Sequence, residues 1–257
     1  MDGELLNLAG RNILLTGGCG ALGRAIASTL ERHGACVAVN DILPEDEAAL
    51  LLPASDSVCY VKSDSSSPAL AGQLIDRASE ALGAMPDTVL CHAGVVRSHA
   101  IETFPEDVFD HIIDVNLRSS FFVAQASSRA WRAKESGGHL IFTSSWVAET
   151  PWPGVGPYSA SKAAINALMR SFAREMAPYA IRSNAVAPGI VAAGMAQHQW
   201  DTEADYRKRA GKAIPLGRLQ DLESVANSLL FLCSPMANYM TGAVLTVDGG
   251  CSLYPMD

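Results

Sequence analysis

Hydrophobic and polar positions along the chain form two kinds of pattern. Short apolar runs such as 12–17 (NILLTG) end at glycines or acids, which is typical of buried strands. Longer stretches carry apolar residues three and four apart, as in 21–34, and predict helices. We predict strands at 12–17, 35–40, 57–64, 87–94, 139–145, 181–189 and 243–250, and helices at 21–34, 67–83, 105–134 (one long helix or two consecutive ones), from about Tyr158 to Pro178, and at 222–234.

This alternation of strands and helices predicts an α/β fold with a doubly wound parallel sheet and helices on both faces. No internal repeat or linker divides the chain, so we expect a single domain over 1–257. A fold of this kind places its ligand beyond the carboxyl ends of the strands. Six residues lie at or just past predicted strand ends: Thr16, Asp41, Asp64, Ala93, Ser145 and Pro188.

Composition narrows the classes of function. The 257 residues are 49% hydrophobic, enough for one large core, and the formal net charge is -8. An acidic chain has no general attraction to nucleic acid or anionic membrane, so we expect neither partner. The six cysteines form no C-x-x-C pair and mostly lie in apolar runs, which indicates reduced core thiols in a cytoplasmic protein. The histidines lack ligand spacing, so no metal is expected.

Targeting signals are also lacking in the sequence pattern. The first ten residues, MDGELLNLAG, are acidic and have no basic segment followed by an apolar one, so we expect no signal peptide. No run of about 18 apolar residues occurs, and we therefore expect no membrane span.

A glycine-rich turn joins the first predicted strand to the first helix. In TGGCGALG (16–23), Gly17 permits a tight turn and Gly23 lets the helix approach the strand closely. Backbone N–H groups at the helix start would then face a pyrophosphate, aided by the helix dipole. The turn predicts a dinucleotide site.

Asp41 ends the second predicted strand, 18 residues after Gly23. This matches the spacing of about 20 residues expected for a carboxylate that binds the adenosine ribose hydroxyls. A carboxylate there repels a 2′-phosphate, and no Arg or Lys occurs from 33 to 61 to offset it. We therefore predict NAD rather than NADP as the cofactor.

Tyr158 and Lys162 lie four residues apart where a helix is predicted to begin, and so share one helix face. The ammonium would lower the pKa of the phenol, which could then take a proton from an alcohol or return it to a carbonyl. Ser145 lies thirteen residues upstream at a strand end, and its hydroxyl could orient the substrate oxygen.

With these motifs in order, the chain resembles the short-chain dehydrogenase/reductase family, in the branch of 3-oxoacyl-carrier-protein reductases and sugar or polyol dehydrogenases. The resemblance covers nearly the whole chain and implies a Rossmann-type sheet of about seven strands. Its marks are TGGCGALGRAIA (16–27), Asp41, Asp64, CHAG (91–94), VNL (115–117), TSS (143–145), YSASK (158–162), IRSNAVAPG (181–189), IPLGRL (214–219) and TGAVLTVDGG (241–250).

The resemblance implies roles for individual residues. Tyr158 is the acid/base, Lys162 tunes it and holds the nicotinamide ribose, and Ser145, favoured over its neighbour Ser144 by the spacing to the tyrosine, polarises the reacting oxygen. Asn116 anchors a water in the proton relay. Asp64 binds the adenine. The residues expected at the cofactor are Gly17, Cys19, Gly20, Ala21, Leu22, Gly23, Asp41, Ile42, Asp64, Ser65, Ala93, Gly94, Tyr158, Lys162, Pro188, Gly189 and Val191.

Three positions depart from the family pattern. Ala21 replaces the central glycine of the first turn, and its methyl group lies where the pyrophosphate is expected. Cys91 and His92 stand where two asparagines are usual, which puts in doubt the side-chain hydrogen bonds of the first; His92 is interpreted as structural rather than catalytic. Ala193 replaces a threonine that contacts the carboxamide.

The substrate is less well determined. We expect 192–213 to form a lid, within which Met195, His198, Trp200 and Tyr206 either contact the substrate or pack on the body. Glu149, Trp152 and Val155 could line the pocket. Tryptophans with polar neighbours suit a sugar, sugar acid or polyol, which is our prediction together with NAD. The alternative is a 3-oxoacyl-thioester reductase, for whose acidic carrier four basic residues could form a patch: Arg129, Arg132, Lys134 and Arg174.

Two further classes fit less well. A nucleotide-sensing protein on this fold should lack one or more of Asn116, Ser145, Tyr158 and Lys162, and a methyltransferase would not explain Tyr158 and Lys162. The resemblance also implies a homotetramer. Its interfaces would be built by the helices at 105–134 and 158–178, with Phe121, Phe122, Leu168 and Phe172, and by the last strand near Val244–Val247.

Overall fold

The computed structural model describes residues 5–253, and these form one seven-stranded parallel sheet with helices on both faces. The first four residues of the acidic N-terminal segment, from which no signal peptide was expected, lie outside the described residues. The strands are β1 (Asn12–Thr16), β2 (Cys36–Asp41), β3 (Val58–Lys62), β4 (Thr88–Cys91), β5 (Gly138–Thr143), β6 (Ile181–Pro188) and β7 (Val244–Val247).

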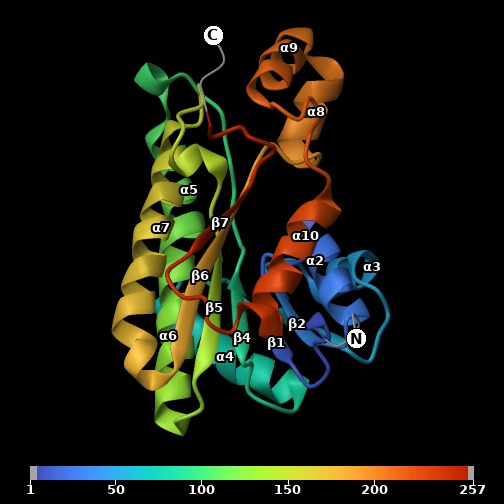
Figure 1. Ribbon diagram of the computed structural model, residues 1–257, viewed down its shortest axis with the longest axis vertical. Helices are drawn as coiled ribbons and strands as arrows, with labels where there is room; N and C mark the ends of the chain where they lie inside the picture. Colours follow the sequence, from blue (N-terminus) through green and yellow to red (C-terminus); the bar gives the residue numbers. More distant parts are fainter. Residues whose placement is uncertain (1–4, 254–257) are drawn as a thin grey trace.

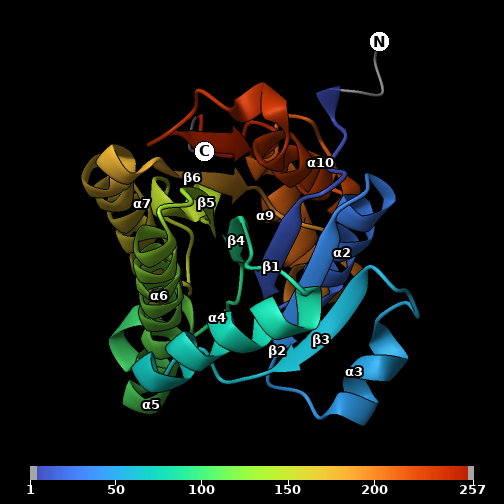
Figure 2. The same cartoon turned by 90° about the horizontal axis from the view of Figure 1, so that it is seen from below.

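The helices cover the two faces unequally. They are α2 (Ala21–Arg32), α3 (Glu45–Leu51), α4 (Pro68–Leu82), α5 (Glu106–Ile113), α6 (Ser119–Lys134), α7 (Gly156–Met176), α8 (Gly194–Thr202), α9 (Ala204–Ala213) and α10 (Leu222–Cys233). Figures 1 and 2 show α2 and α10 on one face, and α4, α6 and α7 on the other. All seven predicted strands and five predicted helical segments are confirmed, while α3, α8 and α9 were not predicted as helices.

The strand order β3-β2-β1-β4-β5-β6-β7 reverses between β1 and β4. Consecutive strands need a crossover to run parallel, and each crossover carries a helix onto one face. The two halves wind in opposite directions from this point, so the loops after β1 and β4 diverge and leave space between them.

Two apolar cores lie on the two faces, and the two-residue period of the strands assigns side chains to them. Ile13 and Leu15 of β1 pack into the core beneath α2 and α10, whereas Leu14 packs into the core beneath α4, α6 and α7. Because both faces are covered, the strands are apolar throughout rather than alternating.

The long predicted helix 105–134 is a nearly continuous run that contains a π-helical turn, Asp114–Arg118. Such a turn inserts one extra residue and is common at functional sites. It separates α5 from α6 without breaking the run, which accounts for the ambiguity of the sequence pattern.

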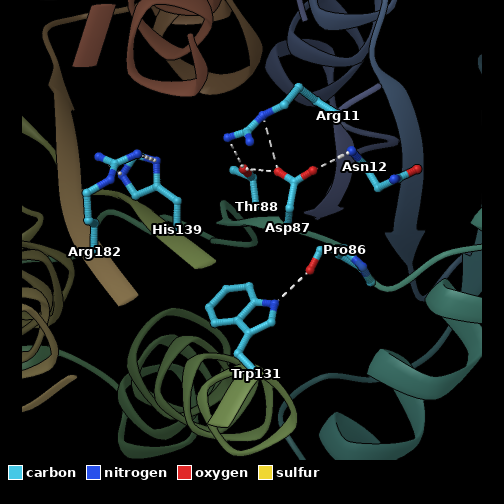
Figure 3. Close-up of polar contacts among 8 residues, drawn as sticks. All are labelled: Arg11, Asn12, Pro86, Asp87, Thr88, Trp131, His139 and Arg182. Carbon is cyan, nitrogen blue, oxygen red and sulfur yellow. Dashed lines mark hydrogen bonds and ion pairs between the residues drawn. The ribbon is translucent and has the colours of Figure 1, made fainter. Parts of the chain in front are cut away.

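A polar cluster joins the amino ends of the central strands (Figure 3). Arg11 forms an ion pair with Asp87 at 3.3 Å, and the Asp87 carboxylate accepts a hydrogen bond from the Asn12 N–H. His139 on β5 is buried beside Arg182 on β6, whose guanidinium donates to the carbonyls of Ala237 and Met240. The cluster fixes the end of the sheet that faces away from the carboxyl-end loops.

All six cysteines are free, and Cys19, Cys91, Cys233 and Cys251 are buried. Within residues 5–253, no helix combines the length and apolar character that crossing a bilayer requires.

Candidate functional site

A cavity of about 890 Å³ opens at the carboxyl ends of the strands. This is at the upper end of the range of about 300–1,000 Å³ typical of small-molecule sites. Every predicted site residue lines it except Cys19 and Asn116. The lining residues that the sequence predicted are Gly17, Gly20, Ala21, Leu22, Gly23, Asp41, Ile42, Asp64, Ser65, Ala93, Gly94, Ser145, Tyr158, Lys162, Pro188, Gly189 and Val191.

The first loop requires glycine at two positions. Gly17 has a φ of +67°, and a Cβ there would lie 2.6 Å from the Ala93 Cα. A Cβ on Gly23 would lie 2.5 Å from the carbonyl oxygen of Gly17. These contacts bring α2 against the loop as the sequence predicted, because only a hydrogen atom fits in either space.

The amino end of α2 has free donors. Its N-cap residue, Gly20, offers no side-chain hydrogen bond, so the first N–H groups of the helix, beginning at Ala21, have no capping partner. Helix N-termini of this kind bind phosphate groups. Cys19 is buried behind the loop, where its backbone N–H donates to Asp41 and its carbonyl accepts from the Arg24 guanidinium at 3.3 Å.

Asp41 is held by two backbone donors at the end of β2. Its Oδ2 accepts from the Cys19 N–H at 3.0 Å, and its Oδ1 accepts from the Ile42 N–H at 2.8 Å. The sequence analysis did not identify one nearby cation, Lys62 on β3. It is the direct register partner of Asp41 and lies one residue beyond the segment 33–61, which has no Arg or Lys. The two do not form an ion pair among the described residues.

Ser145, Tyr158 and Lys162 meet in the cavity. Ser145 follows β5, and Tyr158 and Lys162 lie in the first two turns of α7. The Lys162 Nζ donates to the Thr143 carbonyl at 2.8 Å and lies 5.5 Å from the centre of the Tyr158 ring. Ser144, the competing serine, instead donates to the Lys162 carbonyl at 3.4 Å, so it supports the helix.

The predicted lowering of the tyrosine pKa by the ammonium is not found in this structure. Burial raises the pKa of Tyr158, and a hydrogen bond with Ser145 acts in the opposite direction. The prediction was wrong for this structure because the Lys162 Nζ lies 5.5 Å from the ring centre and is bonded to Thr143, and because Lys162 is buried and Tyr158 half-buried. The same burial lowers the pKa of Lys162 to about 8.

Asn116 lies behind the cavity rather than in its wall. It is fully buried in the π-helical turn, accepts from the Val95 N–H at 2.7 Å, and donates to the Val95 carbonyl and to Ser161. It therefore ties the loop after β4 to α7. A Cβ on Gly94 would lie 3.4 Å from both the Asn116 Oδ1 and the Lys162 Nζ, so this glycine lies directly beside these two groups.

The residues that replace the usual asparagines make hydrogen bonds within the protein, although His92 also lines the cavity. The His92 ring contacts the Thr143 hydroxyl at 3.0 Å, and burial, with Lys162 adding to it, lowers the pKa of His92 to about 4. The Cys91 thiol contacts the Ser120 carbonyl. Thr16 makes the remaining strand links, because its hydroxyl donates to the Leu90 carbonyl and accepts from the His92 and Ala93 N–H groups.

The Pro188-Gly189 turn packs against the last strand. A Cβ on Gly189 would lie 2.7 Å from the backbone of Asp248, so a larger residue would push the turn away. Its N–H donates to the Val247 carbonyl and to the Gln220 side chain. Ala193 lines the cavity, but its methyl group has no hydrogen bond to offer.

The predicted lid segment forms α8 and α9, which lie together beyond the end of the sheet (Figure 1). Met195, Tyr206, Trp152 and Val155 line the cavity, whereas His198, Trp200 and Glu149 do not. Trp200 packs on the apolar cluster beneath α9 instead. Sequence reasoning missed Trp146, Gln199 and Arg209, which also line the cavity, because no motif or spacing marks them.

Known proteins resemble this chain in sequence and fold. The family described as enoyl-(acyl carrier protein) reductase matches residues 19–252. The chain is 33% identical to an L-rhamnose 1-dehydrogenase (NAD(P)(+)) of Sphingomonas sp. over 95% of this chain and 96% of the relative. It is 32% identical to a (3R)-3-hydroxyacyl-CoA dehydrogenase of Mus musculus over 95% and 97%.

Among solved structures, a gluconate 5-dehydrogenase from Burkholderia cenocepacia, crystallised with NADP and tartrate, superposes with a TM-score of 0.90. It is 27% identical, over 99% of this chain and 100% of that one. With a family model that matches most of its length and relatives that cover nearly all of it, the chain belongs to the short-chain dehydrogenase/reductase family of NAD(P)-dependent oxidoreductases that interconvert alcohols and ketones.

Proposed function

We propose that the protein oxidises a secondary alcohol of a sugar, sugar acid or polyol with NAD, with Tyr158 as acid/base. The observation that carries this proposal is the convergence of Ser145, Tyr158 and Lys162 on one cavity that also contains the glycine loop and Asp41. The substrate class is supported by the aromatic wall of Trp146 and Trp152, whose rings pack edge to face at 5.5 Å, and by the similarity to sugar dehydrogenases.

The cavity residues fit a dinucleotide. The uncapped N-terminus of α2 would hold the pyrophosphate, Asp41 the adenosine ribose, Asp64 and Ser65 the adenine end, and the backbone around Val191 the carboxamide. NAD supplies the acceptor for the hydride that leaves the substrate carbon.

The proton chemistry belongs to the chain. Tyr158 takes the hydroxyl proton of the substrate as base, and Ser145 hydrogen-bonds the same oxygen and orients it. Because burial favours the neutral phenol, Tyr158 needs a nearby positive charge to serve as base. Lys162 is the cation nearest its ring, and Asn116 holds the loop and helix on which these groups depend.

Removing the phenol hydroxyl tests the proposal. Tyr158→Phe should lower kcat by about 100-fold or more, the usual contribution of a positioned acid/base, while binding of NADH changes little. Tyr206→Phe is the matched control, since Tyr206 also lines the cavity and has no proposed proton to transfer. Turnover within a few-fold of wild type in Tyr158→Phe would refute the mechanism.

Asp41 is proposed to select NAD. We expect kcat/KM to favour NAD over NADP by about tenfold or more, which corresponds to ~1.4 kcal/mol, because the held carboxylate repels a 2′-phosphate. Asp41→Asn should shift the ratio toward NADP, whereas Asp46→Asn on the exposed face of α3 should not. A wild-type preference for NADP would contradict the proposal, and Lys62→Gln would then show whether that lysine supplies the compensating charge.

The acyl-thioester alternative remains the second candidate because the matching family and one relative carry such names. Its predicted basic patch does not support it. Lys134 ends α6 and Arg174 lies in the last turn of α7, and both helices lead into the amino ends of strands, opposite the cavity. Activity on acetoacetyl thioesters above that on every sugar, sugar acid and polyol would favour this alternative.

A homotetramer is proposed as the assembly. Phe121 and Phe172 pack together across α6 and α7, yet both stay half-buried in the isolated chain, as do Phe122 and Leu168. β7 is an edge strand, with Val244 and Val247 only half-buried. Light scattering after size exclusion should give about four times the 27.1 kDa of the chain, and a monomer would contradict this.

A further inference from the structure

We propose that Arg209 binds a carboxylate of the substrate, so that the enzyme acts on a hydroxy acid such as a sugar acid rather than on a neutral sugar or polyol. This inference rests on the proposed function and specifies its substrate class. Arg209 lies on α9 and lines the same cavity as Ser145, Tyr158 and Lys162.

Aromatic rings hold the guanidinium in place. The Arg209 Cζ lies 5.0 Å from the centre of the Trp152 ring and 5.9 Å from that of Tyr206. The Trp152 ring packs in turn against Trp146, the residue directly after Ser145. A guanidinium on aromatic faces keeps its planar fork of donors and loses little side-chain entropy when an anion binds.

Among the described residues, Arg209 forms no ion pair with an acidic side chain. The ion pairs there are Arg11 with Asp87 and Arg218 with Asp221, and Arg209 makes no hydrogen bond. The acid that starts α9, Glu203, is hydrogen-bonded by the Gln199 amide. A guanidinium that faces a ligand cavity without a protein anion is available to an anion of the ligand.

A single carboxylate matches this site better than a phosphate. The acids that line the cavity are Asp41, Asp64 and Asp114. Asp41 ends β2, Asp64 follows β3 and Asp114 begins the π-helical turn, so none comes from the lid. Arg209 is the one cation that α8 and α9 contribute to the lining, and it carries one unit of charge. The fork of Arg pairs with two carboxylate oxygens in plane, and such a pair fixes the far end of a substrate.

The test compares matched acid and neutral substrates in three proteins: wild type, Arg209→Gln and Lys208→Gln. Lys208 is the matched control because it is exposed on the same helix and does not line the cavity. The pairs are gluconate with sorbitol and 3-hydroxybutyrate with 1,3-butanediol, assayed with NAD and NADP. Calorimetric titration with gluconate and tartrate measures binding independently of turnover, and thermal melting verifies that each variant is folded.

We expect wild type to favour the acid of at least one pair by about tenfold in kcat/KM. Arg209→Gln should lower kcat/KM for that acid by about ten- to hundredfold, mainly by raising KM. This is the range expected when a hydrogen bond to a charged group is lost. The neutral partner should change less than about twofold, and Lys208→Gln should change neither. Arg209→Lys should restore part of the loss, because it returns the charge without the planar fork.

Three results would overturn the inference: neutral partners preferred in both pairs, equal losses on acid and neutral substrates in Arg209→Gln, or equal effects of Arg209→Gln and Lys208→Gln. Arg209→Gln could instead lower kcat/KM for acetoacetyl-CoA but not for acetoacetyl-N-acetylcysteamine, which lacks the phosphates of coenzyme A. That result would assign Arg209 to a phosphate and would also overturn the inference. Tyr158→Phe separates the two proposals, since it should abolish turnover of both pair members and still bind gluconate in the titration.

Discussion

At the scale of single residues, two glycines of the first loop differ in the room around their α-carbons. A Cβ on Gly23 would meet the Gly17 carbonyl oxygen at 2.5 Å, whereas a Cβ on Gly20 would lie 3.6 Å from the same atom. The first distance forces backbone to move, and the second is an ordinary contact. The chain already tolerates a methyl group next door at Ala21.

Gly23→Ala should therefore destabilise the protein by about 1–3 kcal/mol, the usual cost of overpacking, and weaken NADH binding. Gly20→Ala makes the same chemical change three residues earlier, and its free energy of unfolding should stay within about 1 kcal/mol of that of wild type. Denaturant unfolding and NADH fluorescence titration measure the two effects. Equal behaviour of the two variants would show that the loop is not closely packed.

Buried titratable groups are the second residue-scale feature. Burial raises the pKa of Tyr158 and lowers those of Lys162 and His92, so each charged form is disfavoured. Spacing alone could place Tyr158 beside Lys162, but it could not reveal that the ammonium bonds a strand carbonyl. The residue types were predictable, and their electrostatics were not.

At the scale of elements, α10 depends on its N-cap. The Asp221 Oδ1 accepts from the Ser224 N–H at 2.7 Å, and Arg218 pairs with the same carboxylate. These interactions lower the pKa of Asp221. The helix packs on α2 over one face of the sheet, so its start is coupled to the first core.

Asp221→Ala should lower the free energy of unfolding by about 1 kcal/mol, a typical N-cap loss. Asp221→Asn should cost less, because asparagine also caps. Since the pKa of Asp221 is lowered in the folded state, its contribution is present above the unfolded pKa and is lost as the pH falls through the folded value. Denaturant unfolding of both variants measures this, and an alanine variant as stable as wild type would contradict it.

Helices α8 and α9 were the elements least predictable from sequence. Helices α8 and α9 lack a strong apolar stripe, because much of their surface stays exposed and only Tyr206 and Ala210 of their residues are buried. Only the tertiary contact shows that Tyr206 faces the cavity and Trp200 the body. Arg209 has no sequence signal at all, since its role depends on Trp152, which lies 57 positions earlier.

At the scale of the whole molecule, a buried histidine makes stability depend on pH. His139 is 1% exposed within the cluster of Figure 3, and burial, with Arg182 and Arg11 adding to it, lowers its pKa well below 6.5. The Asn184 Nδ2 lies 2.9 Å from its Nε2, and the Arg182 guanidinium lies 3.0 Å from its Nδ1. A proton on this ring would place a second positive charge beside Arg182.

The unfolded chain binds that proton near pH 6.5 and the folded chain does not, so stability is full above pH 6.5 and falls below it. His92 should contribute to the pH dependence of stability in the same direction, because its pKa is lowered to about 4 in the folded protein. Between pH 6.5 and 5 the free energy of unfolding should fall by up to about 1.4 kcal/mol per pH unit for each histidine.

Urea unfolding from pH 8 to 5 measures this slope, and His139→Gln should reduce it by about half. His33→Gln is the matched control, since His33 lies at the half-exposed end of α2. A slope unchanged by His139→Gln would show that the ring is not responsible.

The sequence by itself determined the seven strands and five of the helical segments, the parallel doubly wound sheet, the glycine loop, Asp41, and the set of Ser145, Tyr158 and Lys162. Each depends on local periodicity or on short spacing, and both can be read directly from the sequence. Tertiary structure alone decided that Lys62 stands beside Asp41, that Asn116 and Cys19 lie behind the cavity wall, and that Arg209 rests on Trp152. Those facts depend on distances between segments remote in sequence, which packing of the two cores fixes and which no local pattern encodes.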